Sequence, residues 1–139
     1  DDVRRYRNII HDIKSSSGNI GAYSIERKAA NLESAINIGN MQYAKENRND
    51  RKEGYDCILS FDYACESMEL FVNGRKVNDY FYTGQRALFS LGYFDFPTKI
   101  TAVLHPLHEG DHIYLQEWPK MDDKKACRIE AVTLTEQFS

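Results

Sequence analysis

A histidine and a lysine stand three residues apart near the start of the chain, in a segment rich in small side chains. On a helix, residues three and four apart share a face, so Lys14 and Ser15 would lie beside His11. A neutral imidazole is available near pH 7 as a nucleophile toward an acyl phosphate, and Lys14 would place a positive charge near the phosphoryl oxygens. Ser15, Gly18 and Gly21 are small enough to let another protein's backbone approach closely. The spacing therefore predicts phosphoryl transfer to His11 on a docking face rather than in an enclosed pocket.

A second group of residues with metal-binding chemistry lies between positions 105 and 112, in the run His105-Pro-Leu-His108-Glu-Gly-Asp111-His112. Three imidazoles and two carboxylates could hold a metal ion, but their spacing matches no common site. The pair Gly110-Asp111 is typical of a turn between strands. We interpret the run as a loop with surface histidines, and we expect no metal and no cofactor.

Three acidic residues, Asp62, Glu66 and Glu69, invite comparison with the acid and nucleophile of a glycosidase. That chemistry needs two carboxyl groups facing each other across a cleft, and nothing in the sequence places these three so. We interpret them as solvated strand edges. The chain also has no nucleophile elbow, phosphate-binding loop or zinc-protease helix, so no self-contained catalytic site is expected.

The elements expected to position His11 are helices. Apolar residues recur at helical spacing through the first forty positions, and Ser15–Gly21 is typical of a helix end followed by a turn. The pattern predicts helices at about Asp2–Ser17 and Tyr23–Asn37, with a third, short one near Met41–Arg48. Two helices and a turn cannot bury a core alone, so another chain or the second half must complete the packing.

The aromatic content and the spacing of apolar residues change after the polar run that ends at Gly54. The single Trp, every Phe and most of the Tyr lie beyond it, and apolar residues there alternate with period two. Asn73-Gly74 is a strong hairpin signal, because a type I′ turn needs positive φ at both central positions. Strands are predicted over Tyr55–Tyr63, Met68–Val72, Ala87–Leu91, Ile100–Leu104, His112–Trp118 and Ala126–Thr135. We therefore predict an α+β chain: an N-terminal antiparallel helical hairpin within residues 1–50, then an antiparallel, jelly-roll-like β-sandwich domain over 54–139.

Charge and composition exclude several classes of protein. The formal net charge of −3 does not favour binding to nucleic acid or to an anionic membrane surface. No apolar run approaches the roughly 20 residues needed to cross a bilayer. The cysteines, Cys57, Cys65 and Cys127, lack metal-ligand spacing, and their odd number argues against a complete disulfide framework. One bridge with a spare thiol and three half-buried thiols both stay open.

The N-terminal motif resembles the core of histidine-phosphotransfer (HPt) domains, in which a His-x-x-Lys is followed by small residues and then a Gly-Ala. The residues that carry the resemblance are His11-Asp-Ile-Lys14-Ser15-Ser16-Ser17-Gly18-Asn19-Ile20-Gly21-Ala22. It implies that His11 is the phosphoacceptor, that Lys14 stabilises the phosphate, and that the partner is a response-regulator receiver domain. The family's four-helix bundle would be incomplete here, which leaves three alternatives: a homo-oligomer that completes it, packing of the second half against it, or a segment that is a fragment.

A second resemblance covers most of residues 54–138. Its clearest parts are the run Tyr55-Asp-Cys-Ile-Leu-Ser-Phe-Asp62-Tyr63 and the stretch Met68–Gln85. These are similar to the C-terminal β-sandwich of beta-galactosidase-type glycoside hydrolases, where the domain is accessory and the catalytic carboxylates lie on a separate barrel. The resemblance implies a domain that contacts carbohydrate or supports a neighbouring domain.

Aromatic residues on such a domain could stack on sugar rings. The candidates are Tyr80, Tyr82, Tyr93 and Trp118, although core packing is expected for most of them. Trp118, followed by Pro119 at a strand end, is the candidate expected to be most exposed. We predict Trp118 and Tyr82 as the carbohydrate contacts.

Two hypotheses of function result. The first is a phosphohistidine carrier of a two-component phosphorelay, which accepts a phosphoryl group from a receiver-domain aspartate on His11 and works in the cytoplasm. The alternative is a non-catalytic, carbohydrate-associated accessory domain of a glycoside hydrolase, which would be extracytoplasmic. A third account is an artificial composite with neither activity intact. The cell compartment follows from whichever hypothesis holds.

Overall fold

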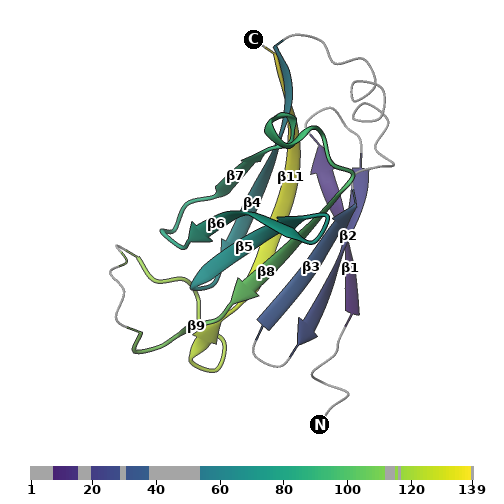
Figure 1. Ribbon diagram of the computed structural model, residues 1–139. Coiled ribbons are helices and arrows are strands. Elements are labelled where there is room, and N and C mark those ends of the chain that lie inside the picture. Colours follow the sequence, from purple (N-terminus) through teal and green to yellow (C-terminus); the bar gives the residue numbers. More distant parts are fainter. Residues whose placement is uncertain are drawn as a thin grey trace.

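The fold of the described residues is almost entirely β. The computed structural model describes residues 8–15, 20–28, 31–37, 54–111, 115 and 117–138. Apart from one 3-10 turn, the regular structure in these ranges consists of strands (Figure 1). None of these residues forms a helix long and apolar enough to cross a membrane.

Eleven strands and the 3-10 turn η1 follow one another along the described chain. They are β1 (Asn8–Ser15), β2 (Ile20–Lys28), β3 (Asn31–Asn37), β4 (Tyr55–Ala64), β5 (Ser67–Val72), β6 (Arg75–Phe81), β7 (Ala87–Ser90), η1 (Gly92–Phe94), β8 (Lys99–His105), β9 (Leu107–His108), β10 (Lys125–Ala126) and β11 (Arg128–Phe138).

Nine of the strands form one sheet, in the order β6-β5-β8-β3-β2-β1-β11-β4-β7, while β9 and β10 form a small separate ladder. All neighbours in the large sheet are antiparallel except β1 and β11, which pair in parallel. The sheet bends around its core, so that β4, β7 and β11 face β3, β5 and β8 (Figure 1). The two end strands, β6 and β7, are thereby brought together on one side of the molecule.

The predicted α+β class is wrong, because the described part of residues 1–50 forms strands rather than a helical hairpin. The bent sheet has two facing layers, so it is only loosely compatible with the predicted jelly-roll-like sandwich. Strands from both sides of residue 50 share this sheet, since β3 pairs with β8 and β1 with β11. The division into residues 1–50 and 54–139 stays a prediction. The third predicted helix, Met41–Arg48, lies outside the described residues.

The helical interpretation failed because its spacing fits both structures. Leu32 and Ile36 are four residues apart, which places them on one face of a helix and equally on one face of a strand. In β3 burial alternates with period two, and Leu32, Ser34 and Ile36 are all buried. Isoleucine is frequent in β1–β3, and β-branched side chains favour strands. The isoleucine content of these segments therefore indicated strands, whereas the four-residue spacing could not distinguish a strand from a helix.

Most of the predicted strands in the second half are confirmed. β4, β5, β7 and β8 match their predicted ranges to within a residue or two, and β11 extends the last one to Phe138. The predicted Asn73-Gly74 turn joins β5 and β6, and both residues have positive φ, 52° and 76°, as a type I′ turn requires. Of the predicted strand His112–Trp118, residues 115, 117 and 118 are described and are not in a strand.

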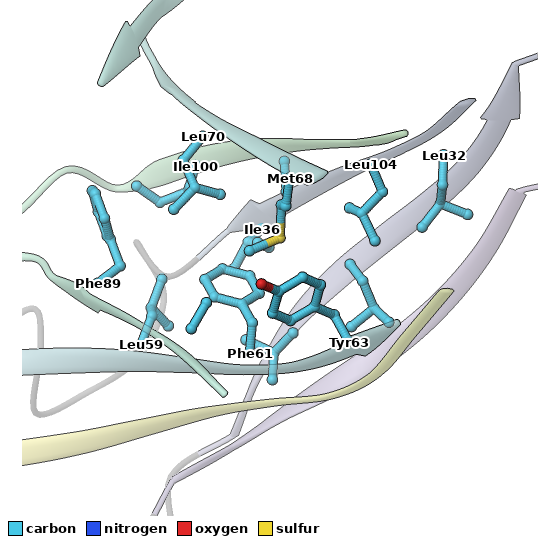
Figure 2. Packing of buried hydrophobic residues seen from close by; sticks show 14 of the residues in the cluster. Leu32, Ile36, Leu59, Phe61, Tyr63, Met68, Leu70, Phe89, Ile100 and Leu104 are labelled. Atoms are coloured by element: carbon cyan, nitrogen blue, oxygen red, sulfur yellow. The ribbon is translucent and has the colours of Figure 1, made fainter. Parts of the chain in front are cut away.

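The core lies between the two layers of the bent sheet. One layer contributes Leu59, Phe61, Tyr63 and Phe89, and the other contributes Leu32, Ile36, Met68, Leu70, Ile100 and Leu104 (Figure 2). Along β4 the buried positions alternate with less buried ones, as expected for a strand that packs on one face. Burial of these large side chains supplies the main favourable term for folding.

A buried hydroxyl within this core gives a test of the fold. Ser34 is 0% exposed and its Oγ has no hydrogen-bond partner among the described residues. It stands opposite Ile25 of β2 and Ala102 of β8, both buried. Because an unsatisfied buried polar group is costly, we expect Ser34→Ala to raise the free energy of unfolding by about 1 kcal/mol in a denaturant titration. Ser67→Ala, at a partly exposed strand position, should change it by less than about 0.5 kcal/mol. A less stable Ser34→Ala protein would contradict the register of β2, β3 and β8.

Candidate functional site

The two ends of the bent sheet meet at a seam between β6 and β7. Tyr80 of β6 donates its hydroxyl hydrogen to the carbonyl oxygen of Leu88 in β7, at 2.8 Å. Asn78 Nδ2 donates to the same Tyr80 oxygen at 2.9 Å, and Asn78 Oδ1 accepts from the Asp79 amide. Burial raises the pKa of Tyr80, which keeps its hydroxyl protonated as a donor. The seam is therefore closed by a side chain instead of by strand pairing.

A groove of about 380 Å³ opens along this seam. We call it the seam groove. It is lined by Val77, Asn78 and Tyr80 from β6, Leu88, Phe89 and Ser90 from β7, and Tyr93 and Phe94 from η1. Four of these eight side chains are aromatic, two are aliphatic and two are neutral polar groups. The lining carries no charged side chain.

The aromatic rings form a series that runs from the core to the surface. Phe89, 1% exposed, stacks on Phe94 with ring centroids 4.9 Å apart and planes 9° apart. Phe94 in turn meets Tyr93 edge-on, at 5.0 Å and 71°. Tyr93 itself is 82% exposed. Its ring is thus a solvent-facing surface fixed through Phe94 to the hydrophobic core.

The carboxylate of Asp56 on β4 holds the turn that carries Tyr93. Its Oδ1 accepts from the amides of Cys57 and Gly92, each at 2.7 Å, and its Oδ2 accepts from Ser90 Oγ at 2.6 Å. Ser90 Oγ then accepts from the Tyr93 amide at 3.1 Å. A Cβ on Gly92 would lie 2.6 Å from Asp56 Oδ1, so glycine is needed for this close approach. The turn is therefore built around a carboxylate that is contributed from a distant part of the chain.

This arrangement suits binding better than catalysis. General acid–base chemistry most often uses an imidazole or a carboxyl within reach of the substrate, and the groove lining offers only the hydroxyls of Tyr80 and Tyr93 as ionisable groups. The carboxylate of Asp56, which holds the turn beside the groove, is already engaged by three donors. What the groove offers is an exposed aromatic face together with the second amide hydrogen of Asn78 and the Tyr93 hydroxyl.

The two predicted carbohydrate contacts flank a different hollow, of about 420 Å³. It is lined by Thr83, Gly84, Gln85 and Glu117, and the chain neighbours of this lining include Tyr82 and Trp118. Trp118 is 40% exposed, whereas Tyr82 packs edge-on against buried Tyr63 at 5.6 Å. Burial raises the pKa of Tyr82. Of the two predicted contacts, Trp118 is the more exposed, and Tyr82 is half-buried against the core.

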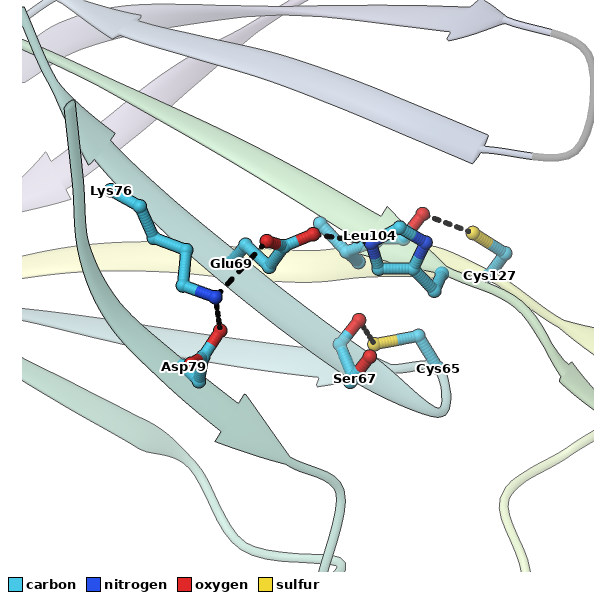
Figure 3. A network of polar contacts seen from close by, with 8 residues as sticks. Cys65, Ser67, Glu69, Lys76, Asp79, Leu104 and Cys127 are labelled. Atoms are coloured by element: carbon cyan, nitrogen blue, oxygen red, sulfur yellow. Dashed lines mark hydrogen bonds and ion pairs between the residues drawn. The ribbon is translucent and has the colours of Figure 1, made fainter. Parts of the chain in front are cut away.

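The acidic residues considered for catalysis do not share a cleft. Asp62 and Glu66 are exposed. Glu69 lies on the outer face of the sheet, where its Oε1 is 2.5 Å from His105 Nε2 and its Oε2 is 3.5 Å from Lys76 Nζ (Figure 3). Lys76 continues the network to Asp79 at 3.0 Å. The residues in these contacts come from β8, β5 and β6. They form a surface ion-pair network rather than a catalytic dyad.

The remaining histidines form no metal centre among the described residues. His108 Nδ1 lies 3.9 Å from Asp111 Oδ2, and the Asp111 carboxylate accepts from the His108 amide at 2.8 Å. This contact is consistent with the predicted turn. His112 lies outside the described residues, and His105 is engaged by Glu69 on the sheet.

The structure removes the helical geometry on which the HPt hypothesis was based. His11 and Lys14 both lie in β1, where the backbone of His11 pairs with Tyr23 and that of Lys14 with Ile20. The helix that was expected to place these two residues on a shared face is therefore not present at these positions. Ser15 and Gly21 also lie in strands, and Gly18 lies outside the described residues. Phosphoryl transfer to His11 stays a prediction that no observation here favours.

Comparison with known protein families, curated proteins and solved structures gives no significant match. The function must accordingly be argued from the site and not from ancestry. The residues that sequence reasoning missed are Asp56 and Asn78. The sequence carries no signal for Asp56, because its partners at Ser90 and Gly92 are more than thirty positions away.

We expect Asp56→Ala to destabilise the protein by about 2 kcal/mol, because three donors lose a charged acceptor in a partly buried place. Ser90→Ala removes one of these bonds and should cost about 1 kcal/mol. Thermal unfolding measures both. The Gly92 amide hydrogen should exchange faster in Asp56→Ala alone, whereas the Tyr93 amide hydrogen, which is donated to Ser90 Oγ, should exchange faster in both variants. Equal stability of Asp56→Ala and the wild type would contradict the assigned role of this carboxylate.

The Glu69 network predicts a pH-dependent contribution to stability. The hydrogen bond with His105 lowers the pKa of Glu69 below its ordinary value of 4.5, and the hydrogen bond with Lys76 lowers it further. Burial acts in the opposite direction but is outweighed. Since the folded-state pKa lies below the unfolded one, the stabilisation is present above the ordinary value and is lost as the pH falls through the folded-state value.

Glu69→Gln should therefore lower the free energy of unfolding at pH 7 by less than about 1 kcal/mol, since the pair is partly exposed. The difference from the wild type should disappear at acid pH in denaturant titrations. The matched control is Glu66→Gln, on an exposed neighbour, which should show little difference at any pH. A difference for Glu69→Gln that stays constant down to acid pH would rule out an effect of the carboxylate charge.

Proposed function

We propose that this chain is a non-catalytic β module that binds a neutral oligosaccharide in the seam groove. The observation that carries the proposal is the Tyr93 ring, 82% exposed and anchored through Phe94 to the core. An exposed aromatic ring held in a fixed orientation offers an apolar face to the C–H groups of a sugar at little conformational cost.

The polar groups of the groove support the same class of ligand. Asn78 donates one amide hydrogen to the Tyr80 hydroxyl, and its side-chain oxygen accepts from the Asp79 amide. The second N–H of its side chain is left available. The Tyr80 oxygen donates to Leu88 and can accept a further bond. Oriented donors and acceptors beside a ring are what sugar hydroxyls need. Because the lining has no charged side chain, a neutral sugar fits better than a sulfated or acidic one.

The size and openness of the site favour a short stretch of oligosaccharide. A volume of about 380 Å³ is near the lower end of the range of roughly 300–1,000 Å³ typical of small-molecule sites. Hydrolysis of a glycoside would need two carboxyl groups facing the bound sugar. The lining provides none, so the proposed role is to hold carbohydrate for chemistry performed elsewhere.

The test is binding of the full chain to an array of neutral oligosaccharides, followed by calorimetry with the best ligand. Tyr93→Ala should weaken binding about tenfold or more without changing the melting temperature, because the ring is a stacking surface and not part of the core. Phe81→Ala is the matched control, since Phe81 is 72% exposed but outside the groove lining.

Two outcomes would contradict the seam groove as the site. If the wild type binds no neutral glycan, the proposal fails outright. If Trp118→Ala abolishes binding while Tyr93→Ala leaves it intact, carbohydrate binds at the hollow beside Glu117, and the seam groove is not the site.

A further inference from the structure

Two of the three cysteines stand where two paired strands end. Cys65 directly follows β4, and Cys127 directly precedes β11. The antiparallel ladder between these strands begins with Arg128 opposite Ala64, so the two cysteines hold the next position along it. Residues opposite each other in such a ladder have Cα atoms about 4.5–5.5 Å apart. A disulfide spans Cα separations of about 4.4–6.8 Å, so the backbone register is compatible with a bridge.

The present contacts of the two thiols also bring them to one region. Cys65 Sγ lies 3.2 Å from the Ser67 carbonyl oxygen, and Cys127 Sγ lies 3.5 Å from that of Leu104 (Figure 3). These acceptors belong to the adjacent strands β5 and β8, in which Ser67 pairs with the residue after Leu104. Thiols are weak donors, so rotating either side chain out of its present contact gives up little. All three cysteines are thiols in this state.

The two thiols differ in access, which assigns them different chemical roles. Cys127 is partly exposed and lines a small cavity of about 170 Å³ together with Asp122, Lys125 and Arg128. The thiolate is the reactive form of a cysteine, and of these two thiols Cys127 is the one that solvent reaches. Cys65 is 0% exposed, and burial, then the neighbouring Cys127, raises the pKa of its thiol. Cys127 is thus placed to react first with a reagent from solution, and Cys65 to react second.

We propose that Cys65 and Cys127 are a modification site that closes to a cross-strand disulfide by exchange with a small-molecule disulfide such as oxidised glutathione. In the first step Cys127 sulfur attacks one glutathione sulfur, the glutathione S–S bond breaks, and one reduced glutathione leaves with the proton from Cys127. In the second step Cys65 sulfur attacks Cys127 sulfur, and the second glutathione leaves with the proton from Cys65. The protein loses two electrons and two protons, and one oxidised glutathione becomes two reduced ones.

The third cysteine has no place in this exchange. Cys57 is buried in the main core, toward the other end of the ladder between β4 and β11, opposite Glu136. Closing the bridge from Cys65 to Cys127 would join the start of β11 to the end of β4 at the point where their ladder stops. A crosslink there restricts the unfolded chain and should stabilise the fold.

The experiment treats the full native chain with oxidised glutathione, alkylates the remaining thiols and maps the peptides by mass spectrometry. We expect a species lighter by two hydrogen atoms before alkylation, a peptide pair joined through Cys65 and Cys127, and Cys57 alkylated after unfolding. The melting temperature should rise by about 5 °C on oxidation and return on reduction.

Three variants separate this site from simple thiol oxidation. Cys57→Ser should form the bridge like the wild type. Cys65→Ser should accumulate a lasting glutathione adduct on Cys127, because the second step is removed, and Cys127→Ser should take up no glutathione without denaturant. A bridge that involves Cys57, a stable glutathione adduct on wild-type Cys127, or a bridge formed only in denaturant would overturn the proposal. None of these results depends on carbohydrate binding.

Discussion

The closure of one bent sheet on itself is the constraint on which the rest of this structure depends. A nine-stranded sheet has two edge strands with unsatisfied backbone groups, and exposed edges invite pairing with other chains. Here the sheet folds so far around its core that β6 and β7 meet, and the Tyr80 hydroxyl reaches the Leu88 carbonyl across the gap. Continuous pairing would have made a barrel wall at this place. Because one side chain spans it instead, a groove remains.

The incomplete closure of the sheet determines which side chains line the groove. No further strand covers the two edge strands at this place, so Asn78, Tyr80 and Phe89 line an open hollow. η1 then adds Tyr93 and Phe94 at one end of it. Asp56 fixes this turn from β4, the strand that pairs with β7, so the aromatic surface moves with the sheet edge and not independently of it.

The same fold decides which polar groups become chemically available. Glu69 has a carboxyl group suited to acid chemistry, but on the outer face of β5 this group is engaged by His105 and Lys76. Asp56 is engaged by three donors. Cys65 and Cys127 are distant in sequence and become neighbours only because β4 and β11 pair along their whole length. The register of the paired strands thus decides which acidic groups are engaged by donors and which cysteines lie next to each other.

Parts of the fold could be predicted from the sequence. Alternation of buried positions along β4 and β8, and the Asn73-Gly74 turn, are local properties, and local reasoning placed them correctly. The N-terminal strands were missed because Leu32 and Ile36 satisfy the helical and the extended period equally. The HPt geometry at His11 depended on that choice of period and was lost with it. Of the aromatic candidates, Trp118 was expected to be the most exposed, but Tyr93 is, at 82% against 40%, while Tyr82 serves mainly as packing.

By itself, then, the sequence determined an extended, aromatic-rich second half with a defined hairpin and without a catalytic signature. Only the tertiary structure decided that the first half is also β, that β6 and β7 meet, and that Asp56 carries the turn of Tyr93. The reason is physical: side-chain alternation and turn conformation are set by neighbours in the chain. A groove, a hydrogen-bonded turn or a pair of cysteines at opposite positions of two strands depends on which strands become adjacent, and that is settled by the packing of the whole core.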